Sequence, residues 1–477
     1  MVEKIKKIIP RKLFLKLSPL YHFLLAFFAA AWHLFPSNKI IVIGVTGTAG
    51  KTSTAYLIYK MLNEAGYKTG LTSTAVFSDG DSEWLNDKKM TMPGRFFIQK
   101  MLQNMLKNKC LFAVIETTSE GIKQFRHRFI NYDTLIFTNL YPEHIESHGS
   151  FKKYKEAKGK LFSHLKRFNN KYVDDDFLVC RVKNGLKKIN FKRIQKTIIV
   201  NGDDSKADYF LNFWSEAKII YSLDNQFEPD SLVKKLNSES LVKDLVVVKG
   251  SLQEVSMDGL DMDINGRNLH LSLLGEFNAR NVLAAYAVGK NYAISEEKIE
   301  SGLKSVKSLA GKLELISSSQ DFFAIVDYSF EPKALENLYK TIKLFPYNKL
   351  IHVLGSTGGG RDKARRPILG QLAAKTADIV IITNEDPYDE DPMEIIKQVA
   401  SGATMSGKKE GEDLLLILDR REALKKAVEL AKKDDLVLVT GKGAEQFICT
   451  RNGKKIPWDD RRELKEAIVD KLCIDKK

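Results

Sequence analysis

The chain has 477 residues, of which 44% are hydrophobic and 28% are charged, as in a folded protein with two or three domains. Its formal net charge is +15, yet lysines and glutamates are interspersed rather than grouped in blocks. Because no nucleic-acid-binding signature accompanies the charge, we expect no nucleic acid among its partners. The four cysteines are far apart, which excludes a disulfide framework and indicates a reducing compartment.

The first 38 residues form a segment that is first basic and then apolar. Residues 1–17 are rich in lysine and arginine, and residues 18–35 (SPLYHFLLAFFAAAWHLF) are at the short limit for a membrane span. No small-residue cleavage site follows them, so a signal peptide is not indicated. We expect a helix that lies either on the inner face of a membrane or on the protein itself.

The rest of the chain alternates between strand and helix patterns in two sections. In the first section, buried parallel strands are expected at 39–45, 111–115, 134–138 and 197–200, followed by short alternating strands at 245–273. In the second, strands are expected at 323–328, 349–355, 378–383, 413–418 and 435–440. We therefore predict an α/β protein with a central P-loop domain at 39–308 and a Rossmann-like C-terminal domain at 309–477, after the segment 1–38.

The strongest motif is a glycine-rich turn between the first strand and the next helix, Gly47-Thr48-Ala49-Gly50-Lys51-Thr52-Ser53. The backbone N–H groups of such a turn and the helix N-terminus bind phosphate oxygens. Lys51 can reach the terminal phosphates, and the Thr52 hydroxyl can bind Mg²⁺. Val45 stands where the strict P-loop pattern has glycine, so the loop is a variant; a glycine-rich turn without a ligand is the alternative.

The segment GVTGTAGKTST (44–54) resembles the phosphate loop of the Mur ligases and of the related folylpolyglutamate synthetases. Five later segments are similar to Mur ligase motifs and follow in the same order: IETTSEGIKQFR (115–126), TNLYPEHIESHGSFKKYKEAKGKLF (138–162), GEFNARNVLAA (275–285), GKLELI (311–316) and VDYSFEP (326–332). The resemblance covers about residues 39–470. It implies an ATP-dependent ligase that joins an acid to an amino acid through an acyl phosphate.

The resemblance also implies the catalytic and metal-binding residues. The catalytic residues would be Lys51, Glu116, His144 and Lys158, and Mg²⁺ would be held by Thr52, Glu116, His144 and Lys158. Glu116 ends an apolar strand near the phosphate loop, where a carboxylate is placed to hold a metal ion. Lys158 lies on an otherwise apolar helical face, so we expect a depressed pKa that lets its amine capture CO₂. The family carries a carbamylated lysine at this position; a snorkelling lysine is the alternative.

Further binding residues are assigned through the resemblance alone. Those expected at the nucleotide are Gly47, Thr48, Ala49, Gly50, Lys51, Thr52, Ser53, Asn278, Asn281, Lys312 and Asp327. Those expected at the muramoyl-peptide substrate are Thr91, Thr118, Ser119, Gln124 and Arg126. At three positions, Glu120, Phe330 and Ala444 replace histidines of the family.

The C-terminal motifs resemble those of the ligases that add the third residue of the peptidoglycan stem peptide. The segments GSTGGGRDKARRP (355–367), TNEDPYDEDP (383–392) and GKGAE (441–445) would bring Arg361, Glu385, Asp386, Tyr388, Gly441 and Glu445 to the incoming amino acid. Tyr388 replaces the arginine that selects diaminopimelate in the family. Two acidic groups without that arginine are better suited to an ammonium, as in lysine or ornithine.

The expected partners are ATP, Mg²⁺, an amino acid and a muramoyl dipeptide. Only 38 residues precede the ATP-binding domain, where the family has a domain that grips UDP. Either UDP is held differently, a partner supplies that domain, or the acceptor is not the usual nucleotide and is lipid-linked instead. We expect a monomeric cytoplasmic enzyme of cell-wall synthesis. The alternatives are a folylpolyglutamate or polyglutamate-type ligase and a catalytically silent, membrane-associated scaffold, the latter motivated by the three replaced histidines.

Overall fold

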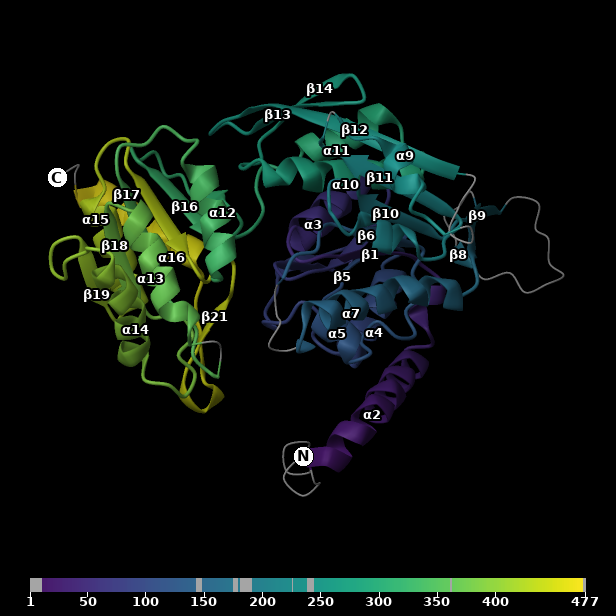
Figure 1. The fold of residues 1–477 in the computed structure, drawn as a ribbon, viewed down its shortest axis with the longest axis horizontal. Coiled ribbons are helices and arrows are strands. Elements are labelled where there is room, and N and C mark those ends of the chain that lie inside the picture. The colour runs from purple at the N-terminus through teal and green to yellow at the C-terminus, as the bar shows by residue number, and fades with distance from the viewer. Residues whose placement is uncertain are drawn as a thin grey trace.

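The computed structural model describes residues 11–142, 148–174, 179–180, 191–224, 226–237, 244–360 and 363–474. Two sequence-predicted site residues, His144 and Arg361, lie outside this part of the chain. Figure 1 shows two α/β domains side by side, each built on one sheet, and an N-terminal helix that projects from the central domain.

The central domain is built on an eleven-stranded sheet with its first strand in the middle, in the order β14-β13-β12-β11-β10-β6-β1-β5-β2-β3-β4. Neighbouring strands are parallel from β12 to β2, and the hairpins at both ends are antiparallel. The strands are β1 (Ile41–Thr46), β2 (Thr69–Thr72), β3 (Val76–Ser78), β4 (Glu83–Leu85), β5 (Phe112–Glu116), β6 (Thr134–Phe137), β10 (Thr197–Asn201), β11 (Ala217–Ser222), β12 (Asp244–Val255), β13 (Leu260–Ile264) and β14 (Arg267–Leu271).

Helices cover both faces of this sheet, which explains why β1 is buried along its whole length. Ile41, Ile43 and Val45 pack in one core with α3 and α10, and Val42 packs in the other with α4 and α7. The helices are α2 (Arg11–Trp32), η1 (Pro36–Asn38), α3 (Lys51–Glu64), α4 (Arg95–Lys107), α5 (Ser119–Lys123), α7 (Phe151–His164), η2 (Leu165–Arg167), α8 (Ala207–Leu211), α9 (Pro229–Val233), α10 (Phe277–Asn291) and α11 (Glu296–Lys304). A small separate sheet holds β7 (Lys171–Val173), β8 (Val179–Cys180) and β9 (Lys192–Ile194).

The C-terminal domain has a six-stranded sheet in the order β15-β16-β20-β17-β18-β19, parallel except for β15. Its strands are β15 (Glu314–Leu315), β16 (Phe323–Asp327), β17 (Leu350–Leu354), β18 (Ile379–Thr383), β19 (Leu414–Ile417) and β20 (Leu436–Thr440). The helices are α12 (Pro332–Ile342), α13 (Arg365–Thr376), α14 (Pro392–Met405), α15 (Arg420–Leu430) and α16 (Asp460–Ile474). The remaining elements are β21 (Phe447–Cys449), η4 (Arg451–Gly453) and β22 (Lys455–Pro457).

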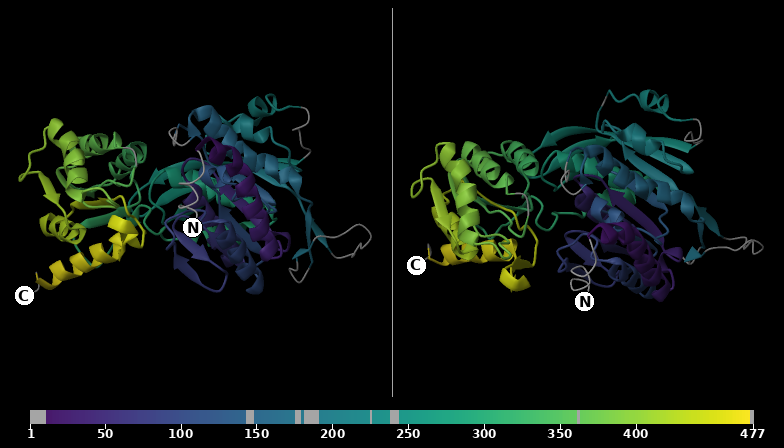
Figure 2. Two further views of the ribbon diagram at one scale, coloured as in Figure 1. Left: turned by 90° about the horizontal axis from the view of Figure 1, so that it is seen from below. Right: turned by 60° about the horizontal axis from the view of Figure 1, so that its bottom comes forward.

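The predicted α/β architecture and all five predicted C-terminal strands are confirmed. The boundary near residue 308 stays a prediction; it falls between α11 and β15. The apolar N-terminal stretch belongs to α2, which lies against the central domain (Figure 2). No helix in the described ranges has the length and apolarity needed to cross a bilayer.

Candidate active site

The phosphate loop lies between β1 and α3, at the carboxyl ends of the parallel strands. Gly50 has a φ of +76°, and a Cβ there would stand 2.4 Å from the Asn281 Oδ1, so this position requires glycine. The segment after β6 holds the loop: the Ala49 N–H donates to Asn139 Oδ1 (2.8 Å), and the Thr138 hydroxyl donates to the Ala49 carbonyl (2.7 Å). The N-terminus of α3 therefore stands open at a fixed loop, as a phosphate site requires.

Two lysine ammonium groups meet at this loop. Lys51 Nζ donates to the Thr48 carbonyl and Lys158 Nζ to the Gly47 carbonyl, each over 2.6 Å. Lys158 is only 1% exposed and lies 4.7 Å from the centroid of the Tyr154 ring, on the α7 face that the sequence predicted to be apolar. The two positive charges favour an anionic ligand between them. The depressed pKa and carbamylation of Lys158 stay predictions.

Glu116 is the buried carboxylate beside the loop. It accepts a hydrogen bond from the Thr52 hydroxyl (3.2 Å) and from the backbone and side chain of Thr74 (2.7 and 2.9 Å). Among the described residues, none of its partners is a lysine or arginine. A carboxylate 1% exposed without a cation is costly, and its oxygens beside a threonine hydroxyl are ligands that Mg²⁺ prefers. Thr52 and Glu116 therefore fit a magnesium site.

The residues expected at the muramoyl peptide surround α5, which follows β5. Thr118 caps α5 by accepting from the Gly121 N–H (3.1 Å), and Gln124 Oε1 accepts from Arg126 Nη2 (2.7 Å). His148 Nε2 lies 3.1 Å from the Ser119 hydroxyl and 3.3 Å from Glu120 Oε1. Glu120, which departs from the family pattern, thus meets a histidine supplied by another motif.

The four nucleotide-binding residues expected outside the phosphate loop lie at two places. Asn281 accepts from the Thr54 hydroxyl (3.1 Å) and donates to Asn278 (2.8 Å), so this pair joins α10 to α3. Asp327, at the end of β16, accepts from the Leu313 N–H (2.8 Å). Lys312 Nζ lies 4.7 Å from the Tyr328 ring centroid. Their contacts with nucleotide stay predictions.

A cluster of charges joins the two domains. Asp386 pairs with Lys89 of the central domain (2.8 Å) and with Lys442 (3.0 Å), and it accepts from the Cys449 N–H (2.6 Å). Glu445 pairs with the same two lysines, at 3.3 Å from Lys89 and 2.5 Å from Lys442. Burial alone would lower the pKa of Lys89, but the carboxylates of Glu445 and Asp386 outweigh it and hold that pKa above its ordinary value. The cluster therefore balances two carboxylates with two lysine ammonium groups.

Glu385 lies beside this cluster and is 4% exposed. Burial raises its pKa, partly offset by the hydrogen bond from the Thr357 hydroxyl to Oε1 (2.7 Å). A Cβ on Gly441 would stand 2.6 Å from Glu385 Oε2, so glycine there admits the carboxyl group. Tyr388 has a φ of +51° and lies against Gly359, where a Cβ would stand 2.7 Å from its ring. Glu385 and Gly441 thus meet just beyond the ends of β18 and β20, and Tyr388 follows in the same segment as Glu385.

A cavity of about 80 Å³ lies where the two domains meet. It is lined by Thr52, Thr74, Ala75, Asn86, Lys89, Met90 and Thr91 of the central domain, and by Ala310, Gly311, Lys312, Tyr328, Ala444 and Glu445. Residues of the phosphate loop and of the charge cluster therefore border one space. Sequence reasoning assigned no role to Thr74, Lys89, Asn139 or Lys442. Asn139 and Lys442 had a visible signal, since each stands in a quoted motif, at 138–162 and at 441–445.

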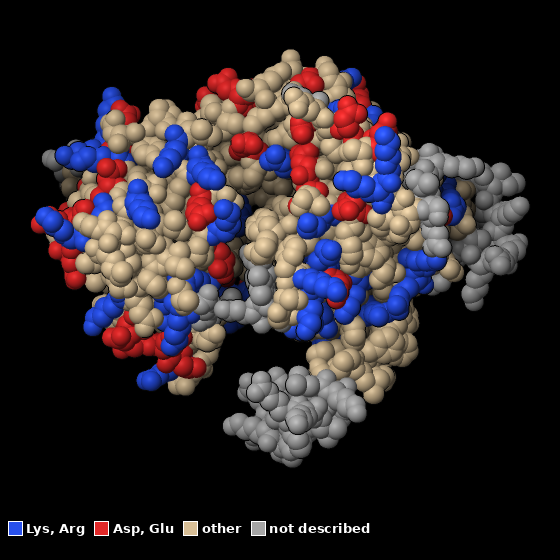
Figure 3. All heavy atoms as spheres, viewed as in Figure 1, with Lys and Arg blue, Asp and Glu red and all other residues tan. Residues whose placement is uncertain are grey.

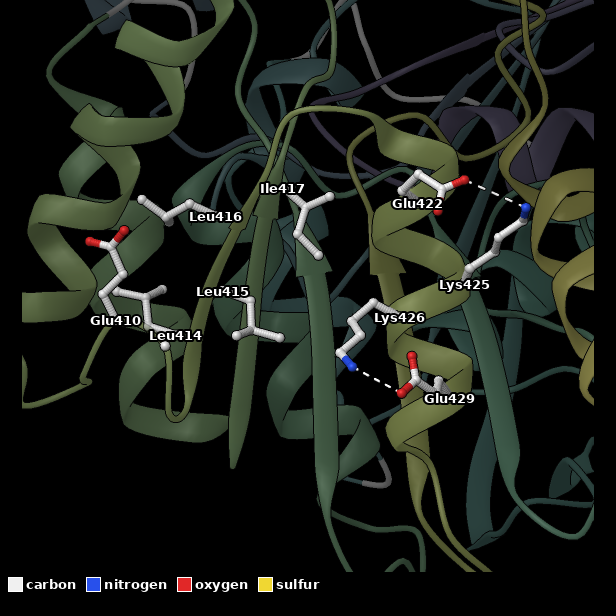
Figure 4. Close-up of a pocket in the computed structure, with 10 residues that line it drawn as sticks. Glu410, Leu414, Leu415, Leu416, Ile417, Glu422, Lys425, Lys426 and Glu429 are labelled. Carbon is white, nitrogen blue, oxygen red and sulfur yellow. Dashed lines mark hydrogen bonds and ion pairs between the residues drawn. The ribbon is translucent and has the colours of Figure 1, made fainter.

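A larger hollow of about 480 Å³ lies beside β19, the last strand in the order of the C-terminal sheet (Figure 4). Leu415 and Ile417 of β19 point toward α15, where Lys426 pairs with Glu429 (3.0 Å). Both of its lysines pair with glutamates, and none of the sequence-predicted site residues lines it. The smaller cavity between the domains is therefore the candidate active site.

Comparison with known families agrees with this geometry. The model described as "Mur ligase middle domain" matches residues 45–289, and the model described as "Mur ligase, glutamate ligase domain" matches residues 311–443. The chain belongs to the Mur ligase family. Mur ligases are ATP-dependent enzymes that join an acid to an amino acid in peptidoglycan synthesis and use Mg²⁺.

Several individual Mur ligases are similar to this one. A UDP-N-acetylmuramyl-tripeptide synthetase of Roseiflexus sp. (strain RS-1) is 32% identical over 94% of this chain and 82% of the relative. A protein of the same name from Borreliella burgdorferi is 35% identical over 91% of this chain and 77% of its own. A solved UDP-N-acetylmuramoyl-L-alanyl-D-glutamate–2,6-diaminopimelate ligase has a TM-score of 0.55 at 25% identity, over 91% of this chain and 79% of its own. Folylpolyglutamate synthase of Mycobacterium tuberculosis shares the fold, with a TM-score of 0.60 at 14% identity, over 88% and 92%.

Proposed function

We propose that this Mur ligase adds an amino acid to a muramoyl dipeptide, as the third residue of the peptidoglycan stem peptide. The observation that carries the proposal is the cavity between the domains, bordered by Thr52 on one side and Glu445 on the other. Holding an activated carboxylate beside an amine supplies much of the rate of such a reaction. The names of the tripeptide synthetases to which the chain is similar support this acceptor.

ATP on the phosphate loop transfers its γ-phosphoryl group to the acceptor carboxylate, which gives an acyl phosphate and ADP. Lys51 and the N-terminus of α3 bind the phosphates. The amine of the incoming amino acid attacks the acyl carbon, phosphate leaves from the tetrahedral intermediate, and the amine loses a proton as the amide forms. Mg²⁺ held by Thr52 and Glu116, with His144 and carbamylated Lys158 as further expected ligands, would neutralise charge on the phosphoryl group.

The amine side of the site favours an amino acid with an ammonium group in its side chain. Asp386 and Glu445 hold the ammonium groups of Lys89 and Lys442, and in this proposal the substrate ammonium takes the place of Lys89. Glu385, with its raised pKa, lies next to them. Lysine or ornithine is therefore the proposed substrate, with Arg361 as the expected partner of its carboxylate.

The remaining assignments are part of the same proposal. Nucleotide binding is assigned to Asn278, Asn281, Lys312 and Asp327, and acceptor binding to Thr91, Thr118, Ser119, Gln124 and Arg126. The acceptor is UDP-linked or lipid-linked, and the enzyme acts in the cytoplasm as a monomer.

Phosphate release tests the function directly. The purified protein is given ATP, Mg²⁺ and a muramoyl dipeptide, either UDP-linked or lipid-linked, and each common amino acid in turn. Turnover that needs both the dipeptide and lysine or ornithine is expected, and a clear preference for one carrier decides how the acceptor is delivered. Turnover that requires glutamate and a folate or polyglutamate acceptor would favour the folylpolyglutamate-type ligase instead.

A further inference from the structure

The N-terminal helix α2 buries small side chains and exposes large apolar ones, which is the reverse of an ordinary surface helix. Its small residues Ala26, Ala29 and Ala30, at most 2% exposed, form the face buried against the domain. Its bulky apolar residues face outward, and the exposed fractions are 57% for Leu20, 42% for Leu24, 57% for Phe28 and 79% for Trp32. These four positions are spaced by four residues and share one face. A helix normally buries its largest apolar side chains, so this exposed face indicates a partner.

The helix is held in place by specific contacts with the central domain. His33 Nδ1 lies 2.9 Å from Gln103 Oε1 of α4, and His22 Nδ1 lies 2.6 Å from Arg95 Nη2. The rings of Phe23 and Phe27 pack against the edge of the Phe129 ring, with centroids 5.2 and 5.5 Å away. The direction in which the exposed apolar face points is therefore fixed relative to the enzyme.

Basic side chains lie on the central domain near the place where α2 leaves it (Figure 3). Arg128 precedes Phe129, and its pKa is lowered by burial and by the neighbouring charge of Arg167. In Figure 3 the visible part of α2 is uncharged, and lysines and arginines gather on the adjacent surface of the central domain. Lys152, Lys153 and Lys160 are exposed on α7, and Arg167 is exposed just after it. In the sequence, residues 4–38 include six lysines and arginines and no acidic residue.

We propose that α2 seats this ligase on the surface of an anionic phospholipid bilayer. The face formed by Leu20, Leu24, Phe28 and Trp32 enters the boundary between headgroups and acyl chains, and the basic residues contact lipid phosphates. A second copy of the chain is the less suitable occupant, because it would bring an equally basic surface against this one. None of the described helices, α2 included, is long and apolar enough to cross a bilayer. A helix that lies in the interface is consistent with this.

Vesicle flotation with the full-length protein tests this inference. The lipids are phosphatidylcholine alone or mixed with phosphatidylglycerol. The test variant is Leu20→Ser/Leu24→Ser/Phe28→Ser, whose side chains are exposed and whose fold should not change. The matched control, Leu344→Ser/Met405→Ser/Leu418→Ser, removes three exposed apolar side chains of the C-terminal domain instead. The emission of Trp32 is obtained as the difference between the spectra of the wild type and of a Trp32→Phe variant.

The wild-type protein and the control variant are expected to float with the anionic vesicles, with a blue shift of Trp32 emission. The α2 variant should bind at least about tenfold more weakly, because several apolar side chains no longer leave water. Equal flotation of the α2 variant, or no flotation of the wild type, would overturn the inference. So would a wild-type dimer that the α2 variant converts to a monomer. The measurement needs no substrate, so a failed ligase assay would leave it intact.

Discussion

The ammonium of Lys89, on the loop after β4, lies 2.8 Å from Asp386 Oδ2, just beyond the end of β18. Both side chains are nearly removed from water, with exposed fractions of 11% and 7%. An ion pair in such surroundings is screened little by solvent, unlike the weak pairs of an open surface. Since each residue comes from a different domain, this ion pair forms only when the two domains are close together. The charges around the amine-binding residues therefore help to hold the domains together.

Lys89→Ala should therefore loosen the closed arrangement. Asp386 keeps Lys442 as a partner, so its carboxylate is not left alone, and we expect the open arrangement to gain population by about tenfold, or ~1.4 kcal/mol. Small-angle X-ray scattering checks this as an increased radius of gyration. Lys88→Ala is the matched control, because Lys88 pairs on the surface with Asp87. A scattering profile identical to that of the control would contradict the coupling.

Lys51→Ala should reduce ATP turnover at least about 100-fold, because Lys51 places its ammonium group at the phosphate loop. The measurement is acceptor-dependent phosphate release at saturating ATP. Lys60→Ala is the control and should keep nearly full activity. Lys60 is on the same helix as Lys51 and pairs with Glu83 of β4. Comparable activity in both variants would remove Lys51 from the mechanism.

Lys158→Ala should abolish most activity, and a short-chain carboxylate should restore part of it, because the expected carbamate contributes a carboxylate to the metal site. Carbon-13 NMR of protein kept in labelled bicarbonate gives a second measurement, with a carbamate signal that the variant lacks. Lys155→Ala on the same helix is the control. An active Lys158→Ala enzyme would contradict the carbamate role.

The sequence predicted the parts of this fold that follow from local pattern. The continuous apolar run at 39–45 became the buried β1, and the apolar face around Lys158 became the buried face of α7, because burial on both faces of a sheet or on one face of a helix leaves a periodic trace. The strand β11 was missed, as were the short strands β2 to β4. These elements have too few residues, or too mixed a pattern, to be separated from loops.

The site was predictable only where a motif carries its own chemistry. The proximity of Thr52, Glu116 and Lys158 to the phosphate loop was expected from such motifs. The meeting of Lys89 with Asp386 was not, since 297 positions separate them and neither flanking segment indicates the other. The partnership of Glu120 with His148 likewise depends on how α5 packs against the segment that precedes α7, which a departure from a family pattern does not reveal.

The buried His352 makes the free energy of unfolding of the C-terminal domain decrease at acidic pH. Burial, and then the charge of Arg420, lower the pKa of His352 from 6.5 to about 3, and its ring hydrogen-bonds to the hydroxyls of Tyr339 (2.8 Å) and Thr440 (3.0 Å). The folded state thus resists protonation that the unfolded chain accepts. This contribution to stability is complete above pH 6.5 and is lost as the pH falls from 6.5 toward 3, by about 1.4 kcal/mol per pH unit.

His352→Gln should remove this slope while lowering stability at neutral pH through the lost hydrogen bonds. Between about pH 7.5 and pH 5 the wild-type domain should lose ~2 kcal/mol more than the variant. Urea unfolding of the C-terminal domain, followed by the fluorescence of the buried Trp458, measures this difference. His270→Gln, at a side chain 53% exposed in the other domain, is the control and should leave the slope unchanged. Parallel pH profiles for the wild type and His352→Gln would contradict this prediction. A histidine that stays neutral only in the folded state must contribute the slope, so the slope would then come from another group.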